Sequence, residues 1–239
     1  MIKRALLCGL AALLASAVHA QNNDAAEVRK AIEASIGKGA KVDSVRDAGF
    51  LGLYEVQVGS DIFYTDKKAA YILLGDVVEA KSRRNLTEER KNKLAQIKFS
   101  DLPLDLAVKQ VRGNGKRVFA TFEDPNCGYC KKLARELQGM TDVTIYTFLY
   151  PILSPDSSEK SKAIWCAPDK AKAWNDWMIN GLEPATAKCD TPTDKVVALG
   201  RKLNIRGTPT LFFADGSRIP GYIPVAQIEQ TISKIGGGS

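Results

Sequence analysis

The stretch FEDPNCGYCKKL, residues 122–133, decides how the rest of the chain is interpreted. It places Cys127 and Cys130 three positions apart, directly after the strand-like run KRVFATF (116–122). If a strand runs into a helix here, Cys127 lies at the helix N-terminus, where unpaired N–H groups and the helix dipole favour a thiolate. The spacing therefore predicts Cys127 as a redox nucleophile and Cys130, one turn later, as the resolving thiol.

A C-x-x-C pair can also bind zinc, attach haem or form an inert disulfide. A structural zinc site needs four N or S ligands, but Cys166 and Cys189 lie far apart and form no second C-x-x-C. Haem attachment needs C-x-x-C-H, and Lys131 occupies the histidine position. An inert bridge closing so tight a ring adds little stability. A redox-active cysteine pair is therefore favoured over these alternatives, and no metal or cofactor is expected.

Lys131 and Lys132 follow the second cysteine directly. They either add positive charge that favours the thiolate or are ordinary lysines of a helix surface. The sequence leaves both readings open.

The first twenty residues, MIKRALLCGLAALLASAVHA, have the basic start, apolar run and small terminal residues of a secretory signal peptide. Cleavage after Ala20 would remove Cys8 and His19, leaving four cysteines and no histidine. This excludes Ser/His and Cys/His nucleophilic machinery, and it indicates disulfides or redox thiols in an exported chain. A lipoprotein anchored at Cys8 is the alternative, although that cysteine lies inside the apolar run.

The chain is mildly basic, with 34 Lys and Arg against 27 Asp and Glu. Without Lys3 and Arg4 the first number falls to 32, a net charge of about +5. No nucleic-acid motif accompanies this charge, so a solvated basic surface is favoured over nucleic-acid binding. No later segment is long enough to span a bilayer, so we expect a soluble exported protein without membrane insertion.

Residues 21–84 are predicted to form a small N-terminal domain. The capping box DAAE (24–27) starts a helix. Strand-like runs follow as an antiparallel meander at 53–58, 61–65, 70–74 and 77–80. Such a domain buries a small core and exposes edge strands. Homodimerisation through an edge is therefore favoured over packing of the meander on the second domain.

A solvent-exposed linker helix is predicted at 85–98, where few large apolar residues stand among many charges. Residues 99–239 are predicted to form the second domain, which has the β-α-β pattern of a parallel sheet. Its elements are a strand at 116–122, a helix at 131–138, a strand at 143–150, a mainly helical region at 156–202, an antiparallel pair at 210–214 and 217–223, and a helix at 225–235.

The segments FEDPNCGYCKKL and RGTPTLFFADGSRIPGY (206–222) resemble the thioredoxin-fold domain of the DsbC/DsbG family of exported bacterial disulfide isomerases. The dipeptide Gly128-Tyr129 between the cysteines is that family's own, and the resemblance extends across the mature chain. It implies an α+β fold with an N-terminal cystatin-like dimerisation domain, a linker helix and a C-terminal thioredoxin-fold domain with a helical insertion.

The resemblance also implies roles for single residues. Pro209 is expected to follow a cis peptide bond beside the cysteines, and Thr208 to present backbone groups that hold a substrate strand. Cys166 and Cys189 match the family's structural disulfide, whose closed loop stabilises the fold by on the order of 3 kcal/mol.

The chain departs from many thioredoxin-like proteins at Thr121, six residues before the nucleophile, where they carry a buried acid as proton acceptor. Glu123 and Asp124 are nearer in sequence. Either could assist proton transfer, but exposed carboxylates at the strand end are favoured. The route by which Cys130 loses its proton is left open.

These inferences predict a homodimeric thiol-disulfide isomerase of a Gram-negative periplasm. Cys127 would attack wrong disulfides in misoxidised exported proteins through a mixed disulfide. The resemblance implies a DsbD-like membrane thiol reductase as electron donor. Three alternatives remain: a DsbG-like reductase or net oxidase of the same fold, a holdase chaperone, and a metal-handling protein.

Overall fold

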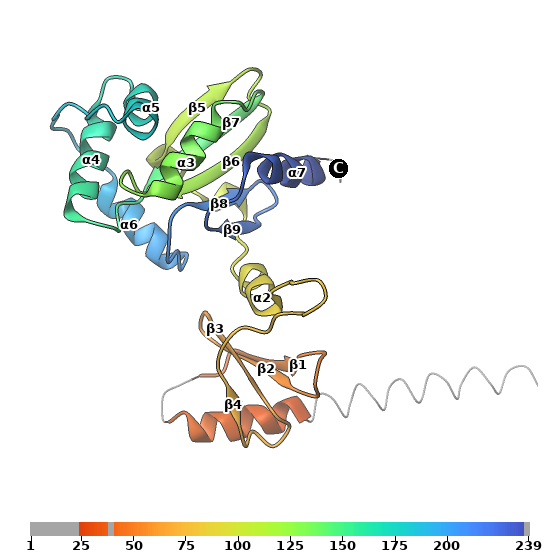
Figure 1. The fold of residues 1–239 in the computed structure, drawn as a ribbon. Helices are drawn as coiled ribbons and strands as arrows, with labels where there is room; N and C mark the ends of the chain where they lie inside the picture. Colours follow the sequence, from red (N-terminus) through yellow and green to blue (C-terminus); the bar gives the residue numbers. More distant parts are fainter. Residues whose placement is uncertain (1–23, 38–40, 237–239) are drawn as a thin grey trace, which may run out of the picture. The chain divides into compact units, whose positions relative to one another are not determined.

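The computed structural model of the chain describes residues 24–37 and 41–236 (Figure 1). The chain divides into two compact units, Met1–Lys91 and Asn92–Ser239. The predicted signal peptide, 1–20, lies outside the described residues. Among the helices that are described, none is both long enough and apolar enough to cross a bilayer. The division after Lys91 falls within the segment predicted as a linker, 85–98. The predicted domain boundaries stay predictions.

The first unit packs one helix against a four-stranded antiparallel sheet. The helix covers residues 24–35, and its Val28 and Ile32 are fully buried beside Val56 and Phe63 of the sheet. The apolar residues therefore recur at helical spacing on the face that the sheet covers. In their order across the sheet, the strands are β1 Ser44–Asp47, β2 Tyr54–Val58, β3 Asp61–Thr65 and β4 Ile72–Leu73.

Residues 77–80 were predicted as a strand of the meander, but they do not pair with β4. Val78 forms an isolated antiparallel bridge with Asn85, and the Leu86 N–H donates to the Val77 carbonyl at 2.9 Å. This strand prediction was wrong, because a local turn satisfies the backbone groups that a strand would have offered to β4.

Helix α2, Leu86–Leu94, follows that turn and is shorter than the predicted linker helix. Polar contacts hold its start. Buried Thr87 shares a hydrogen bond of 2.7 Å with the hydroxyl of Tyr64, and Arg90 donates to the buried carboxylate of Glu55 at 2.8 Å. A helix with so few apolar residues is thus fixed by charge and hydroxyl contacts rather than by an apolar face.

The second unit contains a five-stranded mixed sheet. Strands β6 and β7 run parallel, and every other neighbouring pair is antiparallel. In their order across the sheet, the strands are β5 Val108–Arg112, β7 Val143–Leu149, β6 Arg117–Glu123, β8 Thr210–Phe213 and β9 Arg218–Pro220. The 3-10 helices η1 Phe99–Asp101 and η2 Leu104–Leu106 precede β5.

Helices cover both faces of this sheet (Figure 1). They are α3 Gly128–Leu137, α4 Pro155–Cys166, α5 Lys170–Asn180, α6 Thr193–Lys202 and α7 Val225–Gly236. Phe119 of β6 packs with Leu133 of α3 and with α7, whereas Phe122 packs with Val196 of α6. Because side chains alternate along a strand, odd-numbered positions of β6 face α3 and even-numbered positions face α6.

Two elements differ from the sequence predictions. Strand β5 was not predicted, although Val108 and Gln110 are buried and Lys109 is exposed in the alternating manner of an edge strand. Helix α3 begins at Gly128 rather than at 131. Cys127 is the N-cap of this helix and Cys130 lies in its first turn, as the spacing of the motif predicted.

Candidate active site

Cys127 caps the N-terminus of α3. Its sulfur accepts a hydrogen bond from the backbone N–H of Cys130, with 3.3 Å between N and Sγ. Both cysteines are free thiols; Cys127 is 6% exposed and Cys130 is fully buried. One thiol thus lies at the positive end of the helix and the other one turn inside it.

The two thiols have opposite electrostatic environments. The hydrogen bond from the Cys130 side chain is the main cause that lowers the pKa of Cys127 to about 5; Thr208 and backbone N–H groups add to it, and burial opposes it. Burial, followed by the hydrogen bond to Cys127, raises the pKa of Cys130 far above its ordinary value. At neutral pH, Cys127 is therefore an ionised thiolate that can act as a nucleophile, and Cys130 is a protonated thiol.

A second loop approaches the nucleophile from the other end of the unit's sequence. The peptide bond between Thr208 and Pro209 is cis, and the Cys127 sulfur lies 3.3 Å from the Thr208 carbonyl oxygen, to which the protonated thiol donates. The carbonyl of Pro209 accepts the Gly221 N–H at 2.8 Å, which connects this loop to the end of β9. Thr208 and Pro209 thus lie where the resemblance placed them, beside Cys127.

The two lysines of the motif contact aromatic rings. Lys131 Nζ lies 4.0 Å from the ring centroid of Trp177, and Lys132 Nζ lies 4.3 Å from that of Tyr222. The Tyr222 ring also stacks on the exposed ring of Tyr129, with centroids 5.9 Å apart. Sequence reasoning did not single out Tyr222, although it stands inside the quoted segment 206–222.

The prediction that Glu123 and Asp124 are exposed was wrong, since their exposed fractions are 1% and 0%. Strand β6 continues through Glu123 and is a central strand between β7 and β8, and helices pack on both faces of this sheet. The predicted strand ended at residue 122, whereas β6 continues to Glu123, and this extra residue places the Glu123 side chain inside the unit. Burial raises the pKa of Glu123 to about 8.

Asp124 is fully hydrogen-bonded inside the unit. Its Oδ2 accepts the N–H groups of Ile152 and Leu153 at 2.8 and 2.9 Å, and its Oδ1 accepts the N–H of Asn126 and the hydroxyl of Ser157, both at 2.8 Å. This carboxylate therefore orders the loop before Cys127 and holds it to the start of α4.

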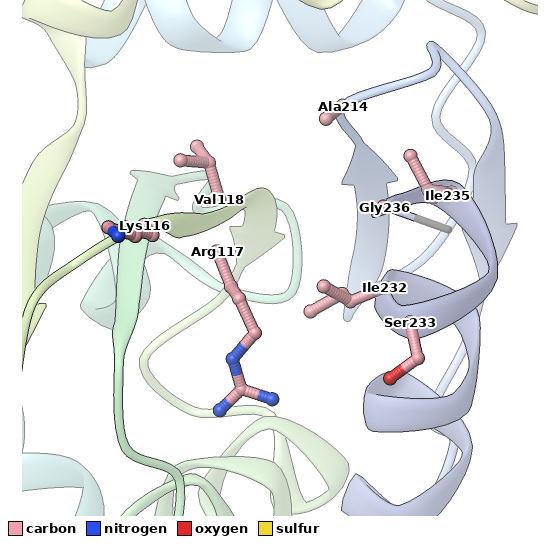
Figure 2. Close-up of a pocket in the computed structure, with 8 residues that line it drawn as sticks. All are labelled: Lys116, Arg117, Val118, Ala214, Ile232, Ser233, Ile235 and Gly236. Atoms are coloured by element: carbon pink, nitrogen blue, oxygen red, sulfur yellow. The ribbon is translucent and has the colours of Figure 1, made fainter. Parts of the chain in front are cut away.

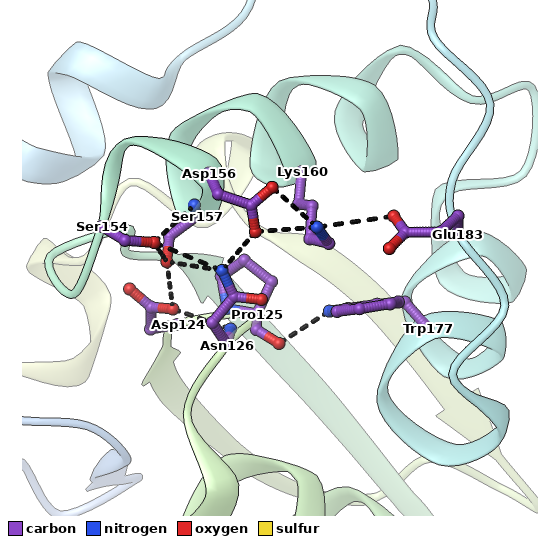
Figure 3. Close-up of polar contacts among 9 residues, drawn as sticks. All are labelled: Asp124, Pro125, Asn126, Ser154, Asp156, Ser157, Lys160, Trp177 and Glu183. Atoms are coloured by element: carbon purple, nitrogen blue, oxygen red, sulfur yellow. Dashed lines mark hydrogen bonds and ion pairs between the residues drawn. The ribbon is translucent and has the colours of Figure 1, made fainter.

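Further polar contacts hold the same loop to the helical insertion (Figure 3). The Asn126 side chain donates to Asp156 at 2.7 Å, and Lys160 pairs with that carboxylate on α4. The indole N–H of Trp177 on α5 donates to the Pro125 carbonyl at 2.6 Å. The insertion thus fixes the backbone that leads into the nucleophile.

Cys166 and Cys189 form a disulfide with an S–S distance of 2.01 Å. It joins the last residue of α4 to the irregular segment between α5 and α6. These two sulfurs therefore do not form part of the free thiol pair.

A pocket of about 440 Å³ lies between the start of β6 and α7 (Figure 2). Lys116, Arg117 and Val118 line one side, and Ile232 and Ile235 line the other. It is at the opposite end of β6 from the cysteines. Within residues 24–37 and 41–236, no group of three His, Cys, Asp or Glu side chains gathers as a metal site.

Two domain families match the chain. Residues 104–236 match the family described as "Thioredoxin-like domain". Residues 18–88 match the one described as "Disulfide bond isomerase protein N-terminal domain". The matches follow the division into two compact units.

Named relatives match most of the chain, and a solved structure matches more than half of it. The "Probable thiol:disulfide interchange protein DsbC" of Bordetella pertussis is 54% identical over 192 residues, which cover 80% of this chain and 68% of the relative. The "Thiol:disulfide interchange protein DsbC" of Escherichia coli K12 is 29% identical over 220 residues, covering 90% and 89%. A crystal structure of a disulfide interchange protein from Neisseria gonorrhoeae is 47% identical, with a TM-score of 0.54, and the match covers 56% of this chain and 97% of that one.

Proposed function

The chain belongs to the DsbC family of thiol:disulfide interchange proteins, and on that premise we propose that Cys127 attacks wrong disulfides and Cys130 resolves the intermediate. The observation that carries this assignment is the position of Cys127 at the helix N-terminus, with a pKa lowered to about 5. At neutral pH this thiol is ionised and is a ready nucleophile.

The reaction proceeds by two routes from one intermediate. The thiolate of Cys127 attacks a substrate sulfur, forming a mixed disulfide and releasing a substrate thiolate. That thiolate can attack a different substrate disulfide and finally displace Cys127, which isomerises the substrate without net oxidation or reduction. Alternatively, Cys130 attacks Cys127, which releases a reduced substrate and leaves the cysteine pair oxidised.

Thr208 and Pro209 are the proposed substrate-binding residues. Support comes from the cis bond between them and from the 3.3 Å contact of the Thr208 carbonyl with the Cys127 sulfur. An extended substrate chain that pairs with the Thr208 backbone would hold its disulfide beside Cys127. The disulfide between Cys166 and Cys189 has a structural role in this proposal, since it lies apart from the thiol pair.

The proposed assembly is a homodimer formed through the edge of the first unit's sheet. Strand β4 is an edge strand, and the side chains of Tyr71, Ile72, Leu73 and Leu74 are 75%, 44%, 47% and 82% exposed. An apolar edge strand that is exposed in this way is a template for pairing with a second copy. Two thiol pairs in one particle would allow one substrate to be attacked at two places.

The proposed location is the periplasm of a Gram-negative bacterium, reached through the predicted signal peptide. There, a pair that becomes oxidised by the second route must be reduced again before it can isomerise. A DsbD-like membrane thiol reductase is the proposed donor, and misoxidised exported proteins are the proposed substrates.

The function is tested with a scrambled-disulfide protein in a glutathione buffer. The wild-type chain should restore substrate activity, and Cys127→Ser should abolish that rescue. Efficient oxidation of a reduced substrate without rescue of a scrambled one would indicate a net oxidase instead. Full rescue by Cys127→Ser would indicate a holdase, and stoichiometric metal in the reduced protein would indicate metal handling.

A further inference from the structure

We propose that Glu123 is the proton acceptor for Cys130 when that thiol resolves the mixed disulfide. This inference rests on the proposed roles of the two cysteines. Glu123 would take the role of the buried acid that many thioredoxin-like proteins carry six residues before the nucleophile, where this chain has Thr121.

The strand places Glu123 beneath the first turn of α3. Phe119, Thr121 and Glu123 occupy alternate positions of β6 and share one face, and Phe119 packs with Leu133 of α3. Cys130 precedes Leu133 by one helical turn, so it lies toward the end of β6 that carries Glu123. Cys130 and Glu123 interact electrostatically, as do Cys127 and Glu123.

Glu123 is a buried carboxyl group with an unused oxygen. Its side chain is 1% exposed, and no hydrogen-bond partner reaches its Oε2; Thr121 Oγ1, on the same face, also has none. Asp124, the next residue, has four donors on its two oxygens. A buried carboxyl without such partners costs folding free energy, which suits a group that exchanges a proton.

The groups that act on the Glu123 carboxyl favour a switch in its charge during the reaction. Burial is the main cause of its raised pKa, and the negative charge of Cys127 adds to it; the nearby Thr121 hydroxyl partly opposes the rise, although the two side chains make no hydrogen bond of normal geometry. When the Cys127 sulfur enters a mixed disulfide, that charge is lost and ionisation of Glu123 becomes easier. Glu123 is thus easier to ionise at the stage at which Cys130 must lose its proton.

The resolving step then balances as follows. The Cys130 proton passes to the Glu123 carboxylate, and the Cys130 sulfur forms a bond with the Cys127 sulfur. The bond between Cys127 and the substrate sulfur breaks, and its electron pair leaves on the substrate thiolate, which takes a proton from water. Cys127 and Cys130 are oxidised to a disulfide, and the substrate is reduced.

The test separates the two chemical steps in the full chain, using a fluorescent peptide that contains one disulfide. Formation of the mixed disulfide should be equal within about twofold in wild type and Glu123→Gln at pH 7, because Cys127 is already ionised there. Its resolution should be at least about tenfold slower in Glu123→Gln, because a general base has been removed. Glu123→Asp should recover part of the rate. Glu229→Gln, which removes a half-exposed carboxylate on α7, is the matched control.

The pH profile of the wild type tests the proposal without relying on any variant. Its resolution rate should rise with an inflection at or below about 8, and Glu123→Gln should lack this inflection. Resolution by Glu123→Gln at the wild-type rate, with the wild-type profile, would overturn the proposal. Absence of any mixed disulfide in the wild type would instead refute the proposed function of the cysteine pair.

Discussion

The ring of Tyr129, between the two cysteines, stacks on the ring of Tyr222, which follows the last strand of the sheet; their centroids are 5.9 Å apart. The Tyr222 hydroxyl donates to Glu136 of α3 at 2.6 Å, and this hydrogen bond holds the ring in place. Tyr129 is 64% exposed, so the stack presents an aromatic surface beside the nucleophile. Such a surface suits apolar side chains of an unfolded substrate.

Tyr222→Ala should therefore weaken attack on peptide disulfides but not on small ones. The lost aromatic contact corresponds to about 0.5–1.5 kcal/mol, a roughly two- to tenfold lower rate constant with a disulfide peptide. The rate with oxidised glutathione should not change, because the contacts of the Cys127 sulfur are intact. Stopped-flow kinetics with both substrates measures this ratio. Tyr222→Phe, which keeps the ring, is the control, and an equal loss with both substrates would contradict the prediction.

Cys130→Ala should raise the pKa of Cys127 from about 5 toward the ordinary thiol value. The Cys130 side chain is the main group that stabilises the thiolate, and alanine removes that hydrogen bond. The thiolate absorbance of Cys127 at 240 nm, followed against pH, gives the value directly. An unchanged titration midpoint would show that the helix N-terminus and the Thr208 loop alone hold the thiolate.

Arg90→Ala should destabilise the first unit by about 1–3 kcal/mol, since it leaves the buried Glu55 carboxylate without one of its two partners. Arg46→Ala should cost at least as much although Arg46 is 45% exposed, because Arg46 donates two hydrogen bonds to Glu55 and contributes more than Arg90 to lowering the pKa of that carboxyl. Hydrogen exchange of the β2 amides under denaturant reports this unit separately. A clearly smaller cost for Arg46→Ala than for Arg90→Ala would contradict this order.

The same carboxylate should make the first unit sensitive to acid. Burial alone raises the pKa of Glu55, but hydrogen bonds and charges from Arg46 and Arg90 lower it below its ordinary value of 4.5. A lowered pKa stabilises the folded state fully above 4.5, and this stability is lost as the pH falls through the folded-state value. Arg90→Ala should move the loss to higher pH. Unfolding measured between pH 7 and pH 3 checks the shift.

Replacing Cys166 and Cys189 together by alanine should destabilise the second unit by on the order of 3 kcal/mol, because an unfolded chain without the cross-link has more freedom. Chemical denaturation of the variant, with the wild type oxidised and reduced as references, measures this. Cys127 should keep its low pKa, since its hydrogen bonds come from α3 and the Thr208 loop. A decrease of less than about 0.5 kcal/mol in the free energy of unfolding would show that this disulfide does not stabilise the unit.

Leu74→Lys together with Ile72→Lys should convert the proposed dimer to a monomer at micromolar concentration. Both side chains are exposed at or beside the edge strand β4, and two new charges on each copy would repel or remain desolvated at a paired edge. Sedimentation equilibrium of the full chain measures the mass. Val111→Lys, at an exposed apolar position of β5, is the control that should leave the mass unchanged.

Local patterns were sufficient to predict the framework of the second unit. The strand before Cys127, the helix after it and the strand 143–150 have strong apolar periodicity, and all three are present. Strand β5 was missed because an edge strand such as VKQVR shows only a short alternation of apolar and polar residues. The failed strand at 77–80 shows the same limit, since a turn competes locally with pairing.

The surroundings of the cysteine pair were harder to predict than the pair itself. The pair follows from its spacing, but the burial of Glu123 depends on β7 and β8, which flank β6 from distant parts of the sequence. The stack of Tyr129 on Tyr222 likewise depends on how the chain returns after β9. Contacts of this kind are tertiary, so no local pattern encodes them.

The disulfide between Cys166 and Cys189 means that the protein itself needs correct disulfide pairing. Removal of the proposed signal peptide would leave four cysteines, and in the proposed oxidising compartment four thiols can pair completely in three ways. Only the pairing of Cys166 with Cys189 leaves the other two cysteines together at the start of α3. Under the proposed function, each copy must therefore mature with one pair closed and the other open, and a copy paired wrongly would itself be a substrate for a copy that has matured.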